Sequence, residues 1–180
     1  MIQRHIEKVR KAICGPPNSR AISLAASVII SAKAGGGTVW TVGNGGSAAM
    51  AQHFAQDLLK ACGVPAQAIN DVSVITAYAN DVAFSKCYED PLRVLWKPSK
   101  DAVFVFSCSG KSRNVESLAR EFSPCVAIVG TDGGALGAQA DVCIHANSME
   151  YDVCETAFSV AADLIVREVM RNLKRRRPGK

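Results

Sequence analysis

Two short stretches rich in glycine carry side chains suited to binding an anion. The first is GNGGSA, 43–48, where glycines permit close backbone approach and Asn44 and Ser47 offer hydrogen bonds. Its spacing is not that of a GxGxxG dinucleotide fingerprint, and it lacks the terminal Gly-Lys-Ser/Thr of a Walker A loop. The stretch therefore predicts a phosphate-type ligand without a nucleotide cofactor.

The second stretch, FSCSGKSRNV, 106–115, brings three hydroxyl groups together. Ser107, Ser109 and Ser112 lie just before a helix expected to start near Asn114. Hydroxyls and free backbone N–H groups at a helix N-terminus bind an anion without a cluster of cations. Either loop alone is typical of an ordinary turn and cap, but two of them in one small domain predict a phosphate site.

The secondary-structure elements that flank these two loops determine where the loops lie in the fold. The apolar runs TVWTVG and DAVFVF precede the loops, and helical patterns follow, so both loops are expected at the carboxyl ends of parallel strands. Nearly uniform apolar strands such as AVFVF and CVAIV predict a sheet covered on both faces. The strand–turn–helix alternation predicts a doubly wound α/β fold.

The chain is long enough for one domain, 1–180, with a sizeable core. Helices are expected over about 1–34, the second capped by Asn18 or Ser19 and stopped by the glycines at 35–37, and the α/β core over about 38–172. A last helix is expected from about Val153 into a basic tail, 173–180.

Composition excludes several classes of protein. Hydrophobic residues make up 48% of the chain and charged residues 21%, values typical of a folded domain and not of a disordered one. No apolar run reaches the roughly 18 residues of a membrane span, and the charged N-terminus has no signal-peptide core, so cytoplasm is expected. Seven scattered cysteines without a CxxC pair predict reduced thiols.

The net charge of +5 is a weak argument for a nucleic-acid partner. The last ten residues, RNLKRRRPGK, hold six Lys and Arg and no acid, so the remainder is about neutral. We therefore interpret the basic end as a solvated helix terminus and tail. A mildly positive field also favours a phosphorylated ligand.

Five motifs in order give a family resemblance. GNGGSA, AQHFAQDL, DVSVITAYAND, SCSGKSRNV and GTDGGAL resemble the sugar isomerase (SIS) domain family, and most of all its phosphoheptose isomerases. The resemblance covers nearly the whole chain and implies a single SIS domain with a flavodoxin-like sheet. It also implies a homotetramer with active sites between subunits, and interconversion of sedoheptulose 7-phosphate with a heptose phosphate.

The resemblance also assigns substrate-binding positions. The family's phosphate loop matches 107–112, with Cys108 replacing the usual threonine by a weaker hydrogen-bonding thiol. The family's sugar-contacting NGG motif matches 44–46, next to Ser47, and its substrate-binding ND pair matches 80–81. The predicted substrate-binding residues are therefore Asn44, Gly45, Gly46, Ser47, Asn80, Asp81, Ser107, Cys108, Ser109 and Ser112.

His53 and Asp57 are spaced i, i+4 on one face of an expected helix. Their positions match a zinc-binding histidine and a glutamate that is both ligand and catalytic base in the family, so the resemblance makes them candidate catalytic and metal residues. Asp57 is one methylene shorter than that glutamate. From the residues alone, a packed helical histidine with a surface partner is the favoured interpretation, and only the resemblance favours a site.

The last helix departs from the family pattern. Cys154, Glu155 and Ala162 take the positions of a Gln, a Glu and a histidine that acts as acid or base. Cys154 is either a soft third zinc ligand beside His53 and Asp57 or a small core residue. Ala162 transfers no proton. His145 is expected to be a structural or rim residue.

The missing histidine leaves several functions open. The first is an isomerase for sedoheptulose 7-phosphate or a similar long-chain ketose phosphate, either slow or acting on a different substrate with Glu155 or Asp163 recruited for proton transfer. The alternatives are a non-catalytic phosphosugar-binding regulator and an adaptor protein of the SIS family. A retained His53–Asp57 pair speaks against the adaptor.

Overall fold

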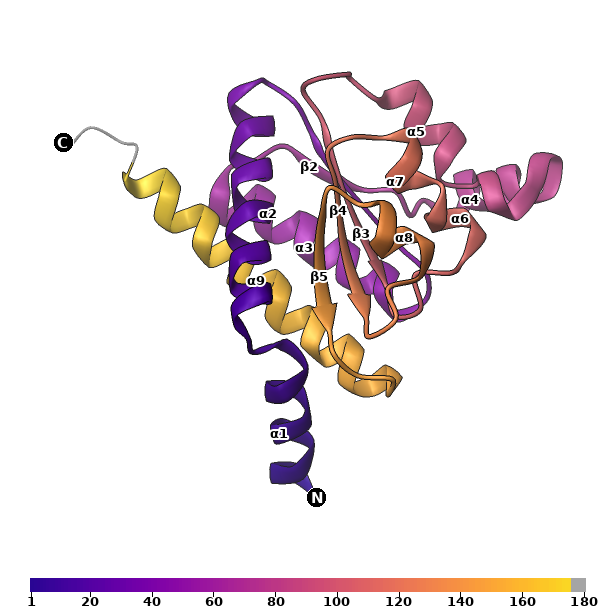
Figure 1. Ribbon diagram of the computed structural model, residues 1–180. Coiled ribbons are helices and arrows are strands. Elements are labelled where there is room, and N and C mark those ends of the chain that lie inside the picture. Colours follow the sequence, from indigo (N-terminus) through magenta and orange to yellow (C-terminus); the bar gives the residue numbers. More distant parts are fainter. Residues whose placement is uncertain (176–180) are drawn as a thin grey trace.

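The computed structural model describes residues 1–175 as helices packed on both faces of one parallel sheet (Figure 1). The helices are α1 (Ile2–Ile13), α2 (Pro16–Ala34), α3 (Gly46–Cys62), α4 (Val72–Tyr78), α5 (Glu89–Leu95), α6 (Arg113–Glu116), α7 (Leu118–Glu121), α8 (Gly134–Gln139) and α9 (Tyr151–Arg175), with a π-helical turn (Ala79–Ala83) and a 3₁₀ turn (Phe84–Lys86) after α4. The strands are β1 (Val39–Gly43), β2 (Ala66–Ala68), β3 (Ala102–Ser107), β4 (Cys125–Gly130) and β5 (Val142–Ala146).

The strand order is β2-β1-β3-β4-β5, with every neighbouring pair parallel. This is the flavodoxin-like order, which confirms the predicted doubly wound α/β fold. The winding direction reverses between β1 and β3. Val39 pairs with Ala102 and Gly43 with Phe106, so these two strands end level and the loops that follow them start side by side.

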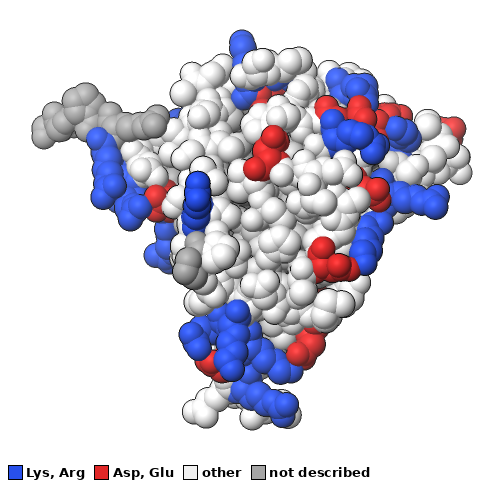
Figure 2. Space-filling model, viewed as in Figure 1, with Lys and Arg blue, Asp and Glu red and all other residues white. Residues whose placement is uncertain are grey.

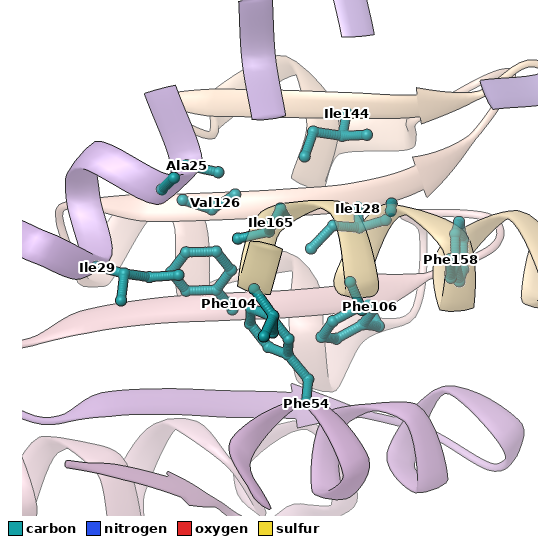
Figure 3. Close-up of a cluster of buried hydrophobic side chains, with 14 of the residues drawn as sticks. Ala25, Ile29, Phe54, Phe104, Phe106, Val126, Ile128, Ile144, Phe158 and Ile165 are labelled. Carbon is teal, nitrogen blue, oxygen red and sulfur yellow. The ribbon is translucent and has the colours of Figure 1, made fainter. Parts of the chain in front are cut away.

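Aromatic packing fixes α3 and α9 against one face of the sheet (Figure 3). Phe54 of α3 lies 5.4 Å from Phe104 and 5.7 Å from Phe106, measured between ring centroids. Phe158 of α9 lies 6.3 Å from Phe106. Burying such side chains contributes about 1.5–3 kcal/mol each. Both helices are therefore held rigidly to β3.

The other face of the sheet is covered by the shorter helices. Their buried apolar residues Leu92, Leu118 and Leu136 come from α5, α7 and α8 and share one buried cluster with Val103 and Val105 of β3. β3 is thus buried on both faces, as its uniformly apolar sequence predicts.

The start of α2 differs from the expected one. The helix begins at Pro16, after Gly15, and proline suits this position because it has no N–H to satisfy there. Asn18 does not cap it. The Asn18 amide donates to the carbonyls of Ile13 and His145 and accepts from the His145 N–H, at 2.7–3.1 Å. This buried side chain ties the α1–α2 corner to β5.

Helical structure follows β2 directly. Asp71 accepts hydrogen bonds from the N–H groups of Ser73 and Val74, which starts α4. The stretch after the serine-rich loop is divided into α6 and α7. The last helix begins at Tyr151, two residues earlier than expected.

Charged side chains are spread over the surface (Figure 2). Lys and Arg gather over the α1 end of the molecule and along the end of α9, as the solvated-terminus interpretation predicts for the described part of the tail; residues 176–180 lie outside the described chain. Within residues 1–175, no helix combines the length and apolar character needed to cross a bilayer.

Candidate functional site

A cleft of about 250 Å³ lies at the carboxyl ends of β1 and β3, where the winding reverses. Its walls come from the loops after these strands and from the first two turns of α9. The lining residues are Asn44, Gly45, Gly46, Ser47, Phe106, Ser107, Cys108, Ser109, Ser112, Tyr151 and Glu155. The structure thus brings together eight of the residues predicted to bind substrate, whose binding role stays a prediction.

The hydroxyl groups of the loop after β3 keep their hydrogens available to a ligand. Ser107 Oγ accepts from the Gly110 N–H at 3.1 Å, and Ser109 Oγ accepts from the Lys111 N–H at 3.3 Å. Within residues 1–175, no hydrogen bond involves the Ser112 side chain. Lys111 itself forms an ion pair with Asp132. The loop therefore offers an anion neutral donors, with its own lysine already paired.

Asn44 is held by a buried hydrogen-bond network. Asn44 Nδ2 donates to Asn114 Oδ1 at 2.9 Å, and Asn114 Nδ2 donates back to Asn44 Oδ1 at 2.8 Å. Tyr88 Oη lies 3.2 Å from Asn44 Oδ1 and 2.7 Å from the Gly43 carbonyl. Burial raises the pKa of Tyr88 to about 12, so it stays a neutral donor. The single hydroxyl hydrogen of Tyr88 has its shorter contact with the Gly43 carbonyl, and Asn44 keeps one Nδ2 hydrogen for a ligand.

Asn114→Ala is expected to lower both stability and ligand affinity. Asn114 is fully buried, and its removal leaves Asn44 without its reciprocal partner, at a cost of about 1–3 kcal/mol in the free energy of unfolding. The freed Asn44 side chain then loses its fixed orientation in the cleft. Urea unfolding and calorimetric titration with inorganic phosphate measure the two effects.

Asn172→Ala is the matched control, because Asn172 also donates through Nδ2, to Glu168 on α9, but lies outside the cleft. It is expected to leave phosphate affinity unchanged. Equal phosphate affinity in both variants and the parent chain would show that the network supports the fold alone.

Two thiols lie beside the cleft. Burial, together with the nearby Cys154 and Glu155, raises the pKa of Cys108 to about 12, so its thiol adds no negative charge to the cleft at neutral pH. Cys154 is only 2% exposed and its Sγ donates to the Ser148 carbonyl at 3.1 Å. Burial raises the pKa of Cys154 as well.

Comparison with known proteins settles the family. The family model described as SIS domain matches residues 4–129. The chain belongs to the SIS domain family. The phosphoheptose isomerase of Cytophaga hutchinsonii is 35% identical over 140 residues, 73% of each chain. The phosphoheptose isomerase of Geobacter sp. (strain M21) is 33% identical over 166 residues, 84% of this chain and 85% of its own.

Solved structures agree with this assignment. The phosphoheptose isomerase structure from Francisella tularensis superposes on this SIS domain with a TM-score of 0.81 at 27% identity, covering 93% of this chain and 92% of its own. The one from Neisseria gonorrhoeae gives a TM-score of 0.79 at 25% identity, with 92% of each chain covered. The similarity includes the N-terminal helices as well as the sheet.

His53 and Asp57 form a pair on the outer side of α3 of this SIS domain. His53 Nε2 lies 3.3 Å from Asp57 Oδ2, and the two side chains are 65% and 34% exposed. Neither residue lines the cleft, although Ser47 at the start of the same helix does. Within one chain, the pair that the resemblance assigns to catalysis therefore lies outside the cleft that holds the two loops.

The predicted zinc ligands are not assembled within the SIS chain. Among residues 1–175, no group of three or more His, Cys, Asp and Glu side chains could hold a metal ion. His53 and Asp57 are only two of the three predicted ligands, while Cys154 packs against Ser148 and beside Gly130 at the end of β4. The residues present in one chain do not fit a zinc site, and we derive no chemical step through a metal.

Cys154→Ala is expected to leave the zinc content per chain unchanged. The buried thiol donates to a backbone carbonyl and does not adjoin the His53–Asp57 pair, so it acts as a packing residue. Elemental analysis of the purified parent and variant measures this content. A zinc content lower by one ion per chain in the variant than in the parent would show that Cys154 is a zinc ligand.

Asn80 and Asp81 also lie outside the cleft of their own chain. Both are exposed on the π-helical turn, where Asn80 Nδ2 donates to Asp81 Oδ1 at 2.7 Å. The segment from α4 to the 3₁₀ turn contains no buried residue and extends away from the sheet (Figure 1). Their predicted role in substrate binding stays a prediction.

Three cleft residues were not among the predicted site residues. Phe106 is a strand residue, and Tyr151 opens a helix without any motif around it. Glu155 entered only as an alternative proton carrier. Ala162, at the family histidine position, is buried, and Asp163 is exposed and paired with Arg167.

Proposed function

We propose that this chain is an aldose–ketose phosphate isomerase acting on sedoheptulose 7-phosphate or a similar long-chain ketose phosphate. One observation carries the proposal: the loops after β1 and β3 supply eight residues, seven of them polar or glycine, to a single cleft. Its relatives named phosphoheptose isomerase support the same substrate class. No nucleotide-binding fingerprint accompanies the cleft.

The cleft suits the two ends of such a substrate. The phosphate accepts hydrogen bonds from Ser109 and Ser112 and from backbone N–H groups of their loop, and hydrogen bonds to a charged group contribute about 1.5–3 kcal/mol each. The free Nδ2 hydrogen of Asn44 then meets a sugar oxygen from the opposite wall. Anchoring at two walls holds the carbonyl end of the sugar near α9.

Incubation with sedoheptulose 7-phosphate in heavy water tests the proposal. Isomerisation through an enediol exchanges the migrating hydrogen with solvent, so NMR should detect an aldose phosphate with deuterium at C2. Calorimetric binding of the sugar phosphate without exchange would instead identify a phosphosugar-binding regulator, the alternative that the alanine at 162 favours. Absence of both binding and exchange would contradict both functions.

A homotetramer is proposed as the working assembly. The segment from α4 to α5 exposes the large apolar residues Val72, Val82, Phe84, Val94 and Leu95, which a second copy of the chain would cover. Asn80 and Asp81 lie in the same segment, so assembly is also the means by which they would approach a neighbour's cleft. Light scattering on the purified chain measures the assembly, and a monomer at working concentration would contradict it.

A further inference from the structure

We propose that Cys108 and Cys154 form a reversible disulfide within the chain, and that this bond displaces the loop after β3 and weakens its phosphate site. The proposal goes beyond the isomerase function and needs only the predicted phosphate site. Cys108 lies between Ser107 and Ser109 of that loop, and Cys154 lies in the first turn of α9. Threonine and glutamine stand at these two positions in the family pattern, so the pair of thiols is a feature of this chain.

The two cysteines meet at Gly130, where β4 ends. A Cβ added to Gly130 would lie 2.4 Å from the Cys108 carbonyl oxygen and 3.4 Å from Cys154 Sγ. The Gly130 N–H donates to the same Cys108 carbonyl at 3.0 Å, which fixes the backbone of Cys108 beside β4. The space left by the missing side chain of Gly130 is therefore bordered by one cysteine from each side.

A cavity of about 120 Å³ also joins the two residues. Its lining residues are Cys108, Ser109, Lys111, Asp132, Ser148, Met149, Tyr151 and Cys154. Cys108 lines the larger cleft of the phosphate site as well. The cavity gives the two cysteine side chains room to rotate toward each other, and the cleft gives a dissolved oxidant access to Cys108.

The two thiols differ in exposure and in acidity. Cys108 is half-buried, whereas Cys154 is only 2% exposed. Burial raises the pKa of both thiols, that of Cys108 to about 12; their mutual interaction adds to this rise at Cys108 and reduces it at Cys154. Cys108 is therefore the thiol that an oxidant reaches, and Cys154 is the neighbour that forms the bond with it.

Two exchanges with a small disulfide, such as glutathione disulfide, form the bond. The Cys108 thiolate attacks one sulfur of the oxidant and releases the first glutathione thiolate. Cys154 then loses its proton to water, and its thiolate attacks Cys108 Sγ and releases the second glutathione. The two cysteines lose two electrons and two protons in total, and the small disulfide takes up both electrons.

The bond is expected to move the serine-rich loop and not the helix. A disulfide holds two sulfur atoms about 2 Å apart, far closer than two unbonded sulfur atoms approach. α9 is held to the sheet by Phe158, whose ring lies 6.3 Å from that of Phe106. The loop therefore shifts toward α9, and Ser109, which follows Cys108 directly, shifts with it. Loss of one hydrogen bond to the phosphate weakens binding by about tenfold or more.

Peptide mapping tests whether the bond forms. The full-length chain is incubated with glutathione disulfide, its remaining thiols are alkylated, and it is cleaved after Lys, Arg and Glu. Cys108 then lies in peptide 101–111 and Cys154 in peptide 151–155, each without another cysteine. Mass spectrometry is expected to find these two peptides joined. The joined form should appear about tenfold faster at pH 8 than at pH 7, because the thiolate fraction rises tenfold per pH unit below the pKa.

Three cysteine positions serve as controls for the map. Exposed Cys14, in peptide 12–20, should carry glutathione and so show that the oxidant reacts. In Cys154→Ala, peptide 101–111 should carry glutathione, because the second exchange is lost. In Cys108→Ser, peptide 151–155 should stay unmodified, because the buried thiol is not reached by the oxidant.

Calorimetric titration with inorganic phosphate tests the effect on the cleft. The bridged chain is expected to bind phosphate at least about tenfold more weakly than the reduced chain, and dithiothreitol should restore the affinity. Cys14→Ser is the matched control. It should lose and regain affinity as the parent does, which shows that glutathione at the end of α1 is not the cause.

Three results overturn the proposal. Glutathione on Cys14 without any joining of 101–111 to 151–155 shows that the bond does not form. Joined peptides with unchanged phosphate affinity show that the bond leaves the cleft intact. A reduced chain that does not bind phosphate overturns the effect together with the predicted phosphate site. The isomerase function is tested separately, by hydrogen exchange in the reduced chain.

Discussion

Replacing Ser109 and Ser112 together by alanine is expected to weaken sugar-phosphate binding by about 10²–10⁴-fold, since two hydrogen bonds to a charged group contribute roughly 3–6 kcal/mol. Both hydroxyl hydrogens are free in the structure, because the Ser109 oxygen only accepts from Lys111 N–H and Ser112 Oγ has no partner within residues 1–175. Calorimetric titration with sedoheptulose 7-phosphate and with inorganic phosphate measures the loss.

A double serine-to-alanine variant on α2, outside the cleft, is the matched control for this loss of affinity. Ser19 and Ser27 are exposed on α2, and their hydroxyls donate only to carbonyls of the preceding turn. Ser19→Ala with Ser27→Ala should leave both affinities unchanged. A loss of only a few tenths of a kcal/mol in the Ser109 and Ser112 variant would show that the phosphate does not bind at this loop.

Gly110→Ala is expected to destabilise the domain by several kcal/mol and to abolish phosphate binding. Gly110 has a φ of +62°, and a Cβ there would overlap the carbonyl oxygen of Gly133 in the loop after β4. That oxygen belongs to backbone, and the two loops are also joined by the Leu136 N–H, which donates to the Gly110 carbonyl at 3.2 Å. Neither loop can move without breaking the other's hydrogen bonds.

Gly36→Ala is the control that separates the cost of a left-handed backbone conformation from the cost of the steric overlap at Gly110. Gly36 has a similar φ of +70°, but no atom lies within 4 Å of the position its Cβ would take. It should therefore lower the free energy of unfolding by only about 1–2 kcal/mol, the cost of a left-handed conformation for alanine. Thermal and urea unfolding compare the two variants. Equal destabilisation in the two variants would show that the close approach of Gly110 and Gly133 is not the reason for a glycine at position 110.

The fold and the location of the cleft follow from local patterns in the sequence. Uniformly apolar strands, such as 102–106 and 125–129, can only be buried on both faces, and alternation with helices leaves a doubly wound sheet as the solution. Because parallel strands end at one edge, the loops at 43–48 and 106–115 had to meet there. The family motifs in those loops pointed to the same edge.

Errors in the sequence-based predictions arose where a side chain found a distant partner. Asn18 was a reasonable helix cap, but its amide bonds to His145, 127 residues away, while Pro16 starts the helix. The substrate-binding role of Asn44 stays a prediction, but its reciprocal hydrogen bonds with Asn114, 70 residues away, were not part of that prediction. Such pairings depend on contacts that no local spacing encodes.

The chemistry of the cleft is the part that tertiary structure decided. The i, i+4 spacing placed His53 and Asp57 on one face of α3 and their contact follows from it, but the spacing does not say whether that face borders the cleft. Packing of α9 against Phe106 and the missing side chain of Gly46 bring Glu155 to the loops. Helix periodicity determines which residues share a face, whereas the packing of helix on sheet determines where that face points.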